Sequence, residues 1–267
     1  MSSNRFSLYV EGRSFLHHLD PRVKLIWIPC GFGLVMTFNH PAFVGATLAV
    51  TLALALSAQL PRKPLTRVIS ASAFVFIASV AVYPLYLKRG PELFTFLGIL
   101  YTRDALLYAL AVGMRLMTMT TMSMVTIMTT TPSATVLGLE QLGLPYYGAV
   151  AMSIMVRYLP TLVVEGNTIV EAQKSRALQL DRGNPVSRAR KYAPIIIPLF
   201  IRSFLLAKQL GLALDARGFG LSHKRTHLLT LRMRRMDWLF IGFWVIALVG
   251  GIIARLLGYG VVIPDLL

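Results

Sequence analysis

Five apolar stretches, each near the length that crosses a lipid bilayer, constrain this chain more than any other feature. A membrane-spanning helix needs about 20 mostly apolar residues. The chain is 55% hydrophobic and 14% charged, whereas a soluble domain carries about 25% charged residues. The sequence therefore predicts an all-α integral membrane protein with about five transmembrane helices. The predicted spans are Val23–Phe38, Ala42–Leu60, Val68–Leu87, Asp104–Thr130 and Trp238–Leu257.

The distribution of Lys and Arg between the spans predicts the orientation. Cations gather before the first span and between the second and third, but are absent from 38–41 and from the tail after Leu257. Lys and Arg favour the cytoplasmic side. Three cations in the third loop weaken the contrast without reversing it. We expect the N-terminus inside the cell, five crossings and the C-terminus outside. The inner set is Arg5, Arg13, Arg22, Lys24, Arg62, Lys63 and Arg67.

Residues 131–237 are predicted to form a cytoplasmic region between the fourth and fifth spans. We therefore divide the chain into 1–130, 131–237 and 238–267. The middle part has a clear excess of Lys and Arg over Asp and Glu. Polar residues recur every three or four positions along 149–176, which is typical of an amphipathic helix. A second long helix is predicted over 194–217, and a short amphipathic one over 134–144.

These two long segments are apolar enough to be taken for further spans, so seven crossings remain the alternative. Arg202, Lys208 and Asp215 interrupt the second segment. Each charge costs about 2.5–3.5 kcal/mol at the centre of a bilayer. We therefore expect long amphipathic helices at the membrane surface, with their apolar faces covered by partner protein or lipid.

The chain has no recognisable catalytic or cofactor site. It contains no phosphate-binding G-x-x-x-x-G-K-[ST] loop and no G-x-S-x-G nucleophile motif. A single cysteine, Cys30, excludes a disulfide within the chain and a cysteine metal cluster. Asp104 is the one acidic residue placed at a span boundary. We expect no enzyme activity, no cofactor and no metal site. The methionines of the fourth span are interpreted as adaptable packing rather than a copper path.

Two short motifs place an arginine between small residues, each where a long helix is expected to end. They are Ser175-Arg176-Ala177 and Ala216-Arg217-Gly218. One such arginine would be an ordinary cation at a helix C-terminus, worth about 0.3–1 kcal/mol. Two copies indicate more, because small neighbours leave a guanidinium free to enter a groove and bind in a forked geometry. Two similar tips suit two copies of one receptor fold.

Four stretches resemble the T components of energy-coupling factor transporters, the CbiQ/EcfT type. They are SFLHHLDPRVKL (14–25), TTTPSATVLGLEQLGLP, VRYLPTLVVEGNTIVEAQKSRA and LALDARGFG. The resemblance extends from about residue 8 to 257. The residues of its N-terminal motif are Asp20, Pro21, Arg22 and Lys24.

The resemblance implies a non-catalytic membrane scaffold with two kinds of partner. Its coupling helices would dock two ABC-type ATPases through Arg176, Arg217 and their small neighbours. Ala177 stands where the family commonly has glycine. A small membrane S component would bind a vitamin or a transition-metal ion for uptake across the cytoplasmic membrane. Which substrate, whether the S component is shared, and whether the ATPases are identical depend on other chains.

Further partners and alternatives follow from charge and composition. The net charge of +16 predicts contact with anionic lipid headgroups rather than nucleic acid, because the cations lie between apolar runs. The alternatives are a conventional ABC permease with its own substrate path and a membrane-bound enzyme that acts on lipid. Either of these would bind substrate without other subunits, whereas a coupling scaffold would not.

Overall fold

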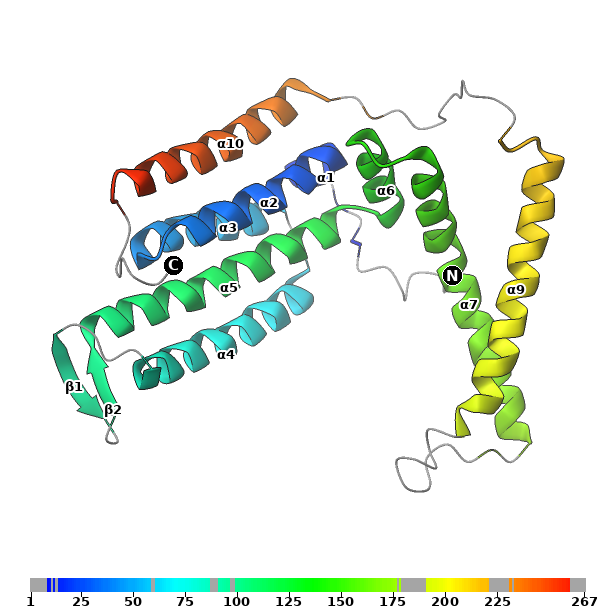
Figure 1. Ribbon diagram of the computed structural model, residues 1–267, viewed down its shortest axis with the longest axis horizontal. Coiled ribbons are helices and arrows are strands. Elements are labelled where there is room, and N and C mark those ends of the chain that lie inside the picture. The colour runs from blue at the N-terminus through cyan, green and yellow to red at the C-terminus, as the bar shows by residue number, and fades with distance from the viewer. Residues whose placement is uncertain are drawn as a thin grey trace. The chain divides into compact units, whose positions relative to one another are not determined.

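The described part of the chain is almost entirely helical in the computed structural model (Figure 1). Its elements form two compact units, one of Ser7–Pro145 with Leu231–Leu267 and one of Met1–Phe6 with Tyr146–Thr230. The residues described are 9–10, 12, 14–58, 61–86, 91–96, 99–176, 178, 191–220, 231 and 233–259.

The first unit, called here the bundle, contains the five segments that the sequence predicts as spans. The all-α prediction is confirmed, with one antiparallel hairpin in addition that the sequence analysis missed. The hairpin joins α4 to α5 through β1 (Glu92–Phe96) and β2 (Ile99–Thr102). The helices of the bundle are α1 (Phe15–His18), α2 (Pro21–Thr37), α3 (Pro41–Ser57), α4 (Arg62–Tyr86), α5 (Arg103–Thr129), α6 (Pro132–Gln141) and α10 (Arg235–Leu256).

Length and hydropathy do not separate the bundle helices from the other two long helices. Among the described residues, α4, α5, α7 (Tyr146–Ser175), α9 (Ala193–Ala216) and α10 are long and apolar enough to span a membrane, and α3 is a shorter apolar helix. The protein is thus a multi-pass membrane protein. Because α7 and α9 belong to this set, composition alone leaves seven crossings as an alternative to five.

Aromatic side chains of α2 and α10 form the centre of the bundle. Trp27 is buried, and its ring lies 5.8 Å from that of Trp244 and 5.7 Å from that of Phe240. Met122 and Met128 of α5 pack into the same core. Met side chains adapt to irregular gaps, so these methionines have the packing role that the sequence analysis favours.

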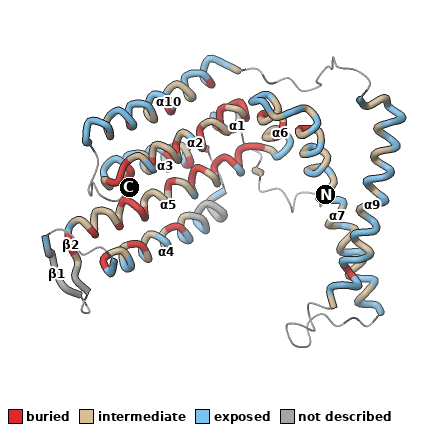
Figure 2. The backbone as a smooth tube through the Cα atoms, in the orientation of Figure 1, coloured by how far each residue is buried: buried red, intermediate tan, exposed pale blue. Residues whose placement is uncertain are grey.

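Helix α5 carries more buried positions than its neighbours, and Figure 2 shows them along its length. It packs against both α3 and α4. Gly113 lies against Phe76 and Ser79 of α4, where a Cβ atom would clash. Ser79 Oγ donates to the carbonyl of Ala109 at 3.0 Å. Small residues and hydroxyls at helix contacts are typical of membrane bundles, because they allow close backbone approach.

Three cationic side chains within the bundle donate to carbonyls at helix C-termini. Lys24 Nζ donates to Thr129 O at 2.9 Å, at the end of α5. Arg115 donates to Val35 O and Phe38 O, and Arg255 donates to Thr37 O, all at the end of α2. The last carbonyls of a helix have no partner within it, and lipid supplies none. These cations therefore stabilise helix ends.

The second unit is an antiparallel pair, α7 with α9, called here the helix pair. Three contacts fix its direction. Tyr146, at the start of α7, stacks on Phe219 just beyond the end of α9, with ring centroids 6.1 Å apart. Glu165 pairs with Arg202 at 3.1 Å. Gln173, near the end of α7, donates to Pro194 O at the start of α9.

The helix pair buries little of its own apolar surface. Figure 2 shows exposed or half-buried residues along nearly all of α7 and α9. Such a surface needs a cover of lipid or protein. Its exposed large apolar side chains include Met155, Leu159, Val164, Ile196, Ile197, Phe200, Ile201, Phe204, Leu205 and Leu212.

Candidate functional site

The second arginine tip is a helix C-terminus closed by a Schellman motif. Gly218 has φ +68°. The N–H of Phe219 donates to Leu214 O and that of Gly218 donates to Asp215 O, both at 2.9 Å. These are the two hydrogen bonds that define the motif. They place Arg217 at the C-cap position, as the last residue before the left-handed glycine.

The first tip, at Arg176, has the longer of these two backbone hydrogen bonds, which spans five residues. The N–H of Leu178 donates to Gln173 O at 3.1 Å, as Phe219 does to Leu214 O. The N–H of Arg176 donates to the same Gln173 carbonyl at 3.1 Å. Arg176 therefore has the same place in its turn as Arg217 has in the other. Ala177 lies outside the described residues.

The backbone cap alone does not distinguish these two helix ends from others in the chain. Gly143, with φ +115°, follows the C-cap of α6, and Gly258, with φ +85°, follows that of α10. Each helix end has the same long hydrogen bond, from Leu144 to Leu139 and from Tyr259 to Ala254. The C-cap residue is a leucine in both. What marks the two tips of the helix pair is the arginine at that position.

Both arginine side chains are exposed, and so are their small neighbours Ser175 and Ala216. Neither guanidinium makes a hydrogen bond or an ion pair with the residues that the structure describes. Arg offers five donors in a fixed planar fork, which matches a carboxylate or a row of carbonyls.

The two tips lie at opposite ends of the helix pair, because α7 and α9 are antiparallel. Arg176 follows the end of α7, where Gln173 contacts Pro194 at the start of α9. Arg217 follows the end of α9, near Tyr146 at the start of α7. The 24 residues of α9 correspond to about 36 Å of helix. One receptor groove could not hold both tips.

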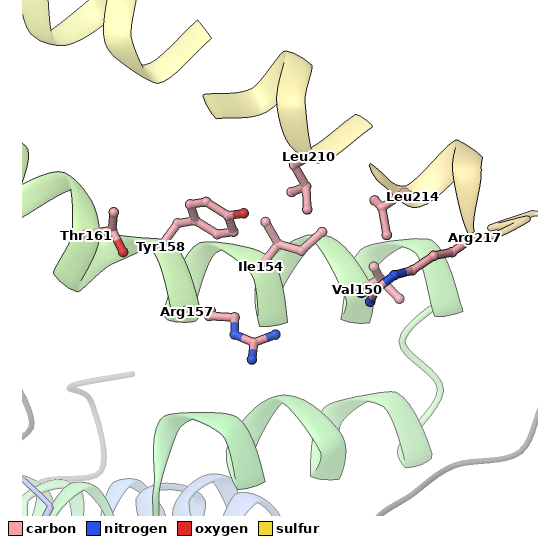
Figure 3. A pocket seen from close by; sticks show the side chains of 8 residues that line it. All are labelled: Val150, Ile154, Arg157, Tyr158, Thr161, Leu210, Leu214 and Arg217. Atoms are coloured by element: carbon pink, nitrogen blue, oxygen red, sulfur yellow. The ribbon is translucent and has the colours of Figure 1, made fainter. Parts of the chain in front are cut away.

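A groove of about 410 Å³ lies between α7 and α9 beside Arg217. Val150 and Ile154 of α7 and Leu210 and Leu214 of α9 provide its apolar lining. In Figure 3, Tyr158 and Ile154 point toward α9, and Arg217 reaches back toward the start of α7. Arg157 also lines the groove. Arg157 was not among the predicted site residues, although it lies on the polar stripe of 149–176.

The predicted N-terminal motif lies in the bundle, at the start of α2. Asp20 caps this helix by accepting from the N–H of Arg22 at 3.0 Å, and Pro21 is the first helical residue. Arg22 donates to Leu231 O at 3.4 Å. Lys24 is buried and also donates to Thr130 Oγ1 at 3.0 Å. The motif therefore joins the start of α2 to the end of α5 and to the segment before α10.

Asp237 corrects the expectation that Asp104 is the one acidic residue at a span boundary. Asp237 lies in the first turn of α10 and is buried. Its Oδ1 accepts from the N–H of Asp20 at 3.1 Å, and its Oδ2 accepts from the N–H of Arg234 at 2.7 Å. The signal was an acidic residue directly before an apolar run, but the sequence does not show its partner.

His17, beside the N-terminal motif, is held between two groups of its own segment. Its Nδ1 lies 2.7 Å from Ser14 Oγ and its Nε2 lies 2.9 Å from Val10 O. The carbonyl can only accept, so Nε2 carries the proton and Nδ1 accepts from the serine hydroxyl. Burial lowers the pKa of His17 below its ordinary value, against a smaller opposing effect of the hydrogen bond to Val10.

Comparison with known proteins identifies the family. The CbiQ family, described as cobalt transport protein, matches residues 12–228. The energy-coupling factor transporter transmembrane protein EcfT of Brevibacillus brevis is 31% identical over 236 residues, covering 85% of this chain and 89% of the relative. EcfT of Thermosediminibacter oceani is 30% identical over 258 residues, covering 92% and 96%. The family match and both relatives cover most of the chain, and the chain therefore belongs to the CbiQ/EcfT family of transmembrane T components of energy-coupling factor transporters.

Proposed function

We propose that this chain couples two ABC-type ATPases to a substrate-binding S component through the arginine tips of its helix pair. The observation that carries the proposal is the repeated tip. Arg176 and Arg217 have equivalent places in their turns, and both side chains are exposed at opposite ends of one antiparallel pair. Two separated and similar arginine tips fit two similar receptors, one on each ATPase. Ser175, Ala177, Ala216 and Gly218 shape the tips.

The same geometry favours a helix pair that lies along the membrane surface. If α7 and α9 crossed the bilayer, the ends that carry Arg176 and Arg217 would be on opposite sides of it. Two cytoplasmic ATPases could not then bind both tips. The proposal therefore places residues 131–237 and the N-terminus in the cytoplasm, with five spans in the cytoplasmic membrane. The S component and lipid would cover the apolar faces of the pair.

The chain itself is proposed to be non-catalytic. ATP hydrolysis belongs to the partner ATPases, since the sequence has no phosphate-binding loop. The substrate, a vitamin or a transition-metal ion, would be bound by the S component. Motion driven by ATP would pass from the ATPases through the tips and along rigid helices to that protein. Turnover of ATP by the pure isolated chain would contradict this assignment.

The test is to co-purify the ATPases and the S component with tip variants and to measure uptake. Removing one partner of a buried charged contact costs about 2–5 kcal/mol, which weakens each docking site by roughly 30- to several-thousand-fold. The Arg176→Ala, Arg217→Ala double variant should lose both ATPases and stop transport while remaining inserted. Arg→Lys should rescue only partly, because an ammonium lacks the planar fork.

A matched control removes two exposed cations from the same helices without touching the tips. Lys174 and Lys208 are exposed on α7 and α9. The Lys174→Ala, Lys208→Ala double variant should keep both ATPases. If the double arginine variant also keeps both ATPases and transports normally, the tips are ordinary helix ends and the proposal is wrong.

A further inference from the structure

The groove beside Arg217 combines an apolar lining with two cations. Val150, Ile154, Leu210 and Leu214 are half-buried along it, and the guanidinium groups of Arg157 and Arg217 are exposed. Its volume of about 410 Å³ lies within the range of about 300–1,000 Å³ that is usual for small-molecule sites. The groove is large enough for part of a lipid chain.

The charges of the groove are not compensated within the helix pair. No carboxylate is among its described lining residues. Arg157 forms no hydrogen bond or ion pair with the part of the chain that the structure describes, in contrast to Arg202, which pairs with Glu165. An anion is the chemical complement of such a site, and Tyr158 and Thr161 add hydroxyl donors nearby.

We propose that this groove binds one acidic phospholipid, with an acyl chain against the four aliphatic side chains and the phosphate held by Arg157, while Arg217 remains at the docking tip. The inference rests on the proposed place of the helix pair at the membrane surface. A phospholipid is amphipathic in the same sense as the groove, which has an apolar lining and a cationic rim. A free anion would leave the lining exposed. An acidic protein segment would need its own apolar side chains to fill it.

Arg157 is the residue that isolates this site, because Arg217 also belongs to the proposed docking tip. The experiment uses the full complex with ATPases and S component, purified in detergent. Dioleoyl-phosphatidylglycerol and dioleoyl-phosphatidylcholine are titrated separately, and retained lipid is counted by native mass spectrometry. The unaltered complex should bind phosphatidylglycerol at least tenfold more tightly than phosphatidylcholine. Arg157→Ala should abolish most of that preference, and Lys208→Ala should preserve it.

Each other result contradicts the lipid assignment. Equal binding of the two lipids, or an unchanged preference in Arg157→Ala, means that the groove does not select an acidic headgroup. Displacement of phosphatidylglycerol by excess inorganic phosphate means a simple anion site. Loss of ATPases from Arg157→Ala in phosphatidylcholine alone means that a protein segment occupies the groove. The proposed function fails separately, when the double tip variant retains its ATPases.

Discussion

Asp237 accepts a hydrogen bond from the backbone N–H of Asp20, a residue 217 positions earlier in the chain, at 3.1 Å. This buried contact joins the first turn of α10 to the residue that caps α2. The second oxygen of the same carboxylate accepts from Arg234 at 2.7 Å. One side chain therefore satisfies the backbone of two helix starts, and the N-terminal motif has a structural role within the bundle.

Removing this carboxylate should destabilise the bundle. Asp237→Ala leaves two N–H groups without acceptors, and each such loss costs about 1–3 kcal/mol. Asp237→Asn keeps one acceptor oxygen and should lose less. In detergent, the unfolding temperature should be highest for the unaltered chain, lower for Asp237→Asn and lowest for Asp237→Ala. Asp215→Ala, at an exposed position on α9, is the control and should behave like the unaltered chain. Equal stability of the two Asp237 variants would mean that its hydrogen bonds are not the cause.

Lys24→Met should lower stability without releasing the ATPases. Lys24 Nζ donates to Thr129 O and Thr130 Oγ1, and methionine fills a similar volume without a donor. The lost partner leaves the Thr129 carbonyl unsatisfied, at about 1–3 kcal/mol. Thermal unfolding measures the loss, and co-purification measures docking. The exposed Arg67 provides the control variant, Arg67→Met. Loss of ATPases from the folded Lys24→Met protein would instead assign the N-terminal motif to docking.

Two glycines, Gly211 inside α9 and Gly218 just beyond its end, should respond oppositely to alanine. Gly218 has φ +68°, a region that costs a residue with a Cβ atom about 1–2 kcal/mol. Gly211 lies inside α9 with open space around it, and alanine there should stabilise the helix by about 0.8–1 kcal/mol. Gly218→Ala should therefore lower the unfolding temperature and weaken ATPase retention. Gly211→Ala should raise the unfolding temperature. A Gly218→Ala protein as stable as the unaltered chain would refute the left-handed cap.

Acid should destabilise the segment around His17. Burial lowers the pKa of this side chain in the folded state, so the folded chain favours neutral imidazole. Its stabilisation is complete above the unfolded pKa of about 6.5 and is lost as the pH falls through the lower folded value. Protonation also removes the acceptor for Ser14 Oγ. His17→Gln should show a smaller fall in unfolding temperature between neutral and acidic pH, and an identical fall in both proteins would contradict this.

The sequence predicts the bounds of the bundle helices well because apolar length is a local property, but it does not decide which helices cross the membrane, since α7 and α9 are as long and apolar as α4, α5 and α10. Helices α3, α5 and α10 begin and end within a few residues of the predicted segments. The helix ends beside Arg176 and Arg217 were also predictable, since the signals that end a helix are adjacent in the chain. The sequence does not reveal the roles of Arg115, Arg255 and Asp237, because each depends on a hydrogen-bond partner that is distant in the chain. The hairpin before α5 and the groove with Arg157 could likewise be identified only from the three-dimensional structure.

The most direct measurement asks whether both tips of the antiparallel pair face the same side of the membrane. Single cysteines replace Ser175 and Ala216, next to the two arginines, in a Cys30→Ser background, and a membrane-impermeant thiol reagent is applied to intact and to permeabilised cells. A cysteine at Leu267 reports the outer side. The account predicts that both tip cysteines react only after permeabilisation, whereas the one at Leu267 reacts in intact cells. Labelling of one tip from outside and the other from inside would mean that α7 and α9 cross the bilayer, and would contradict docking of both tips by cytoplasmic ATPases.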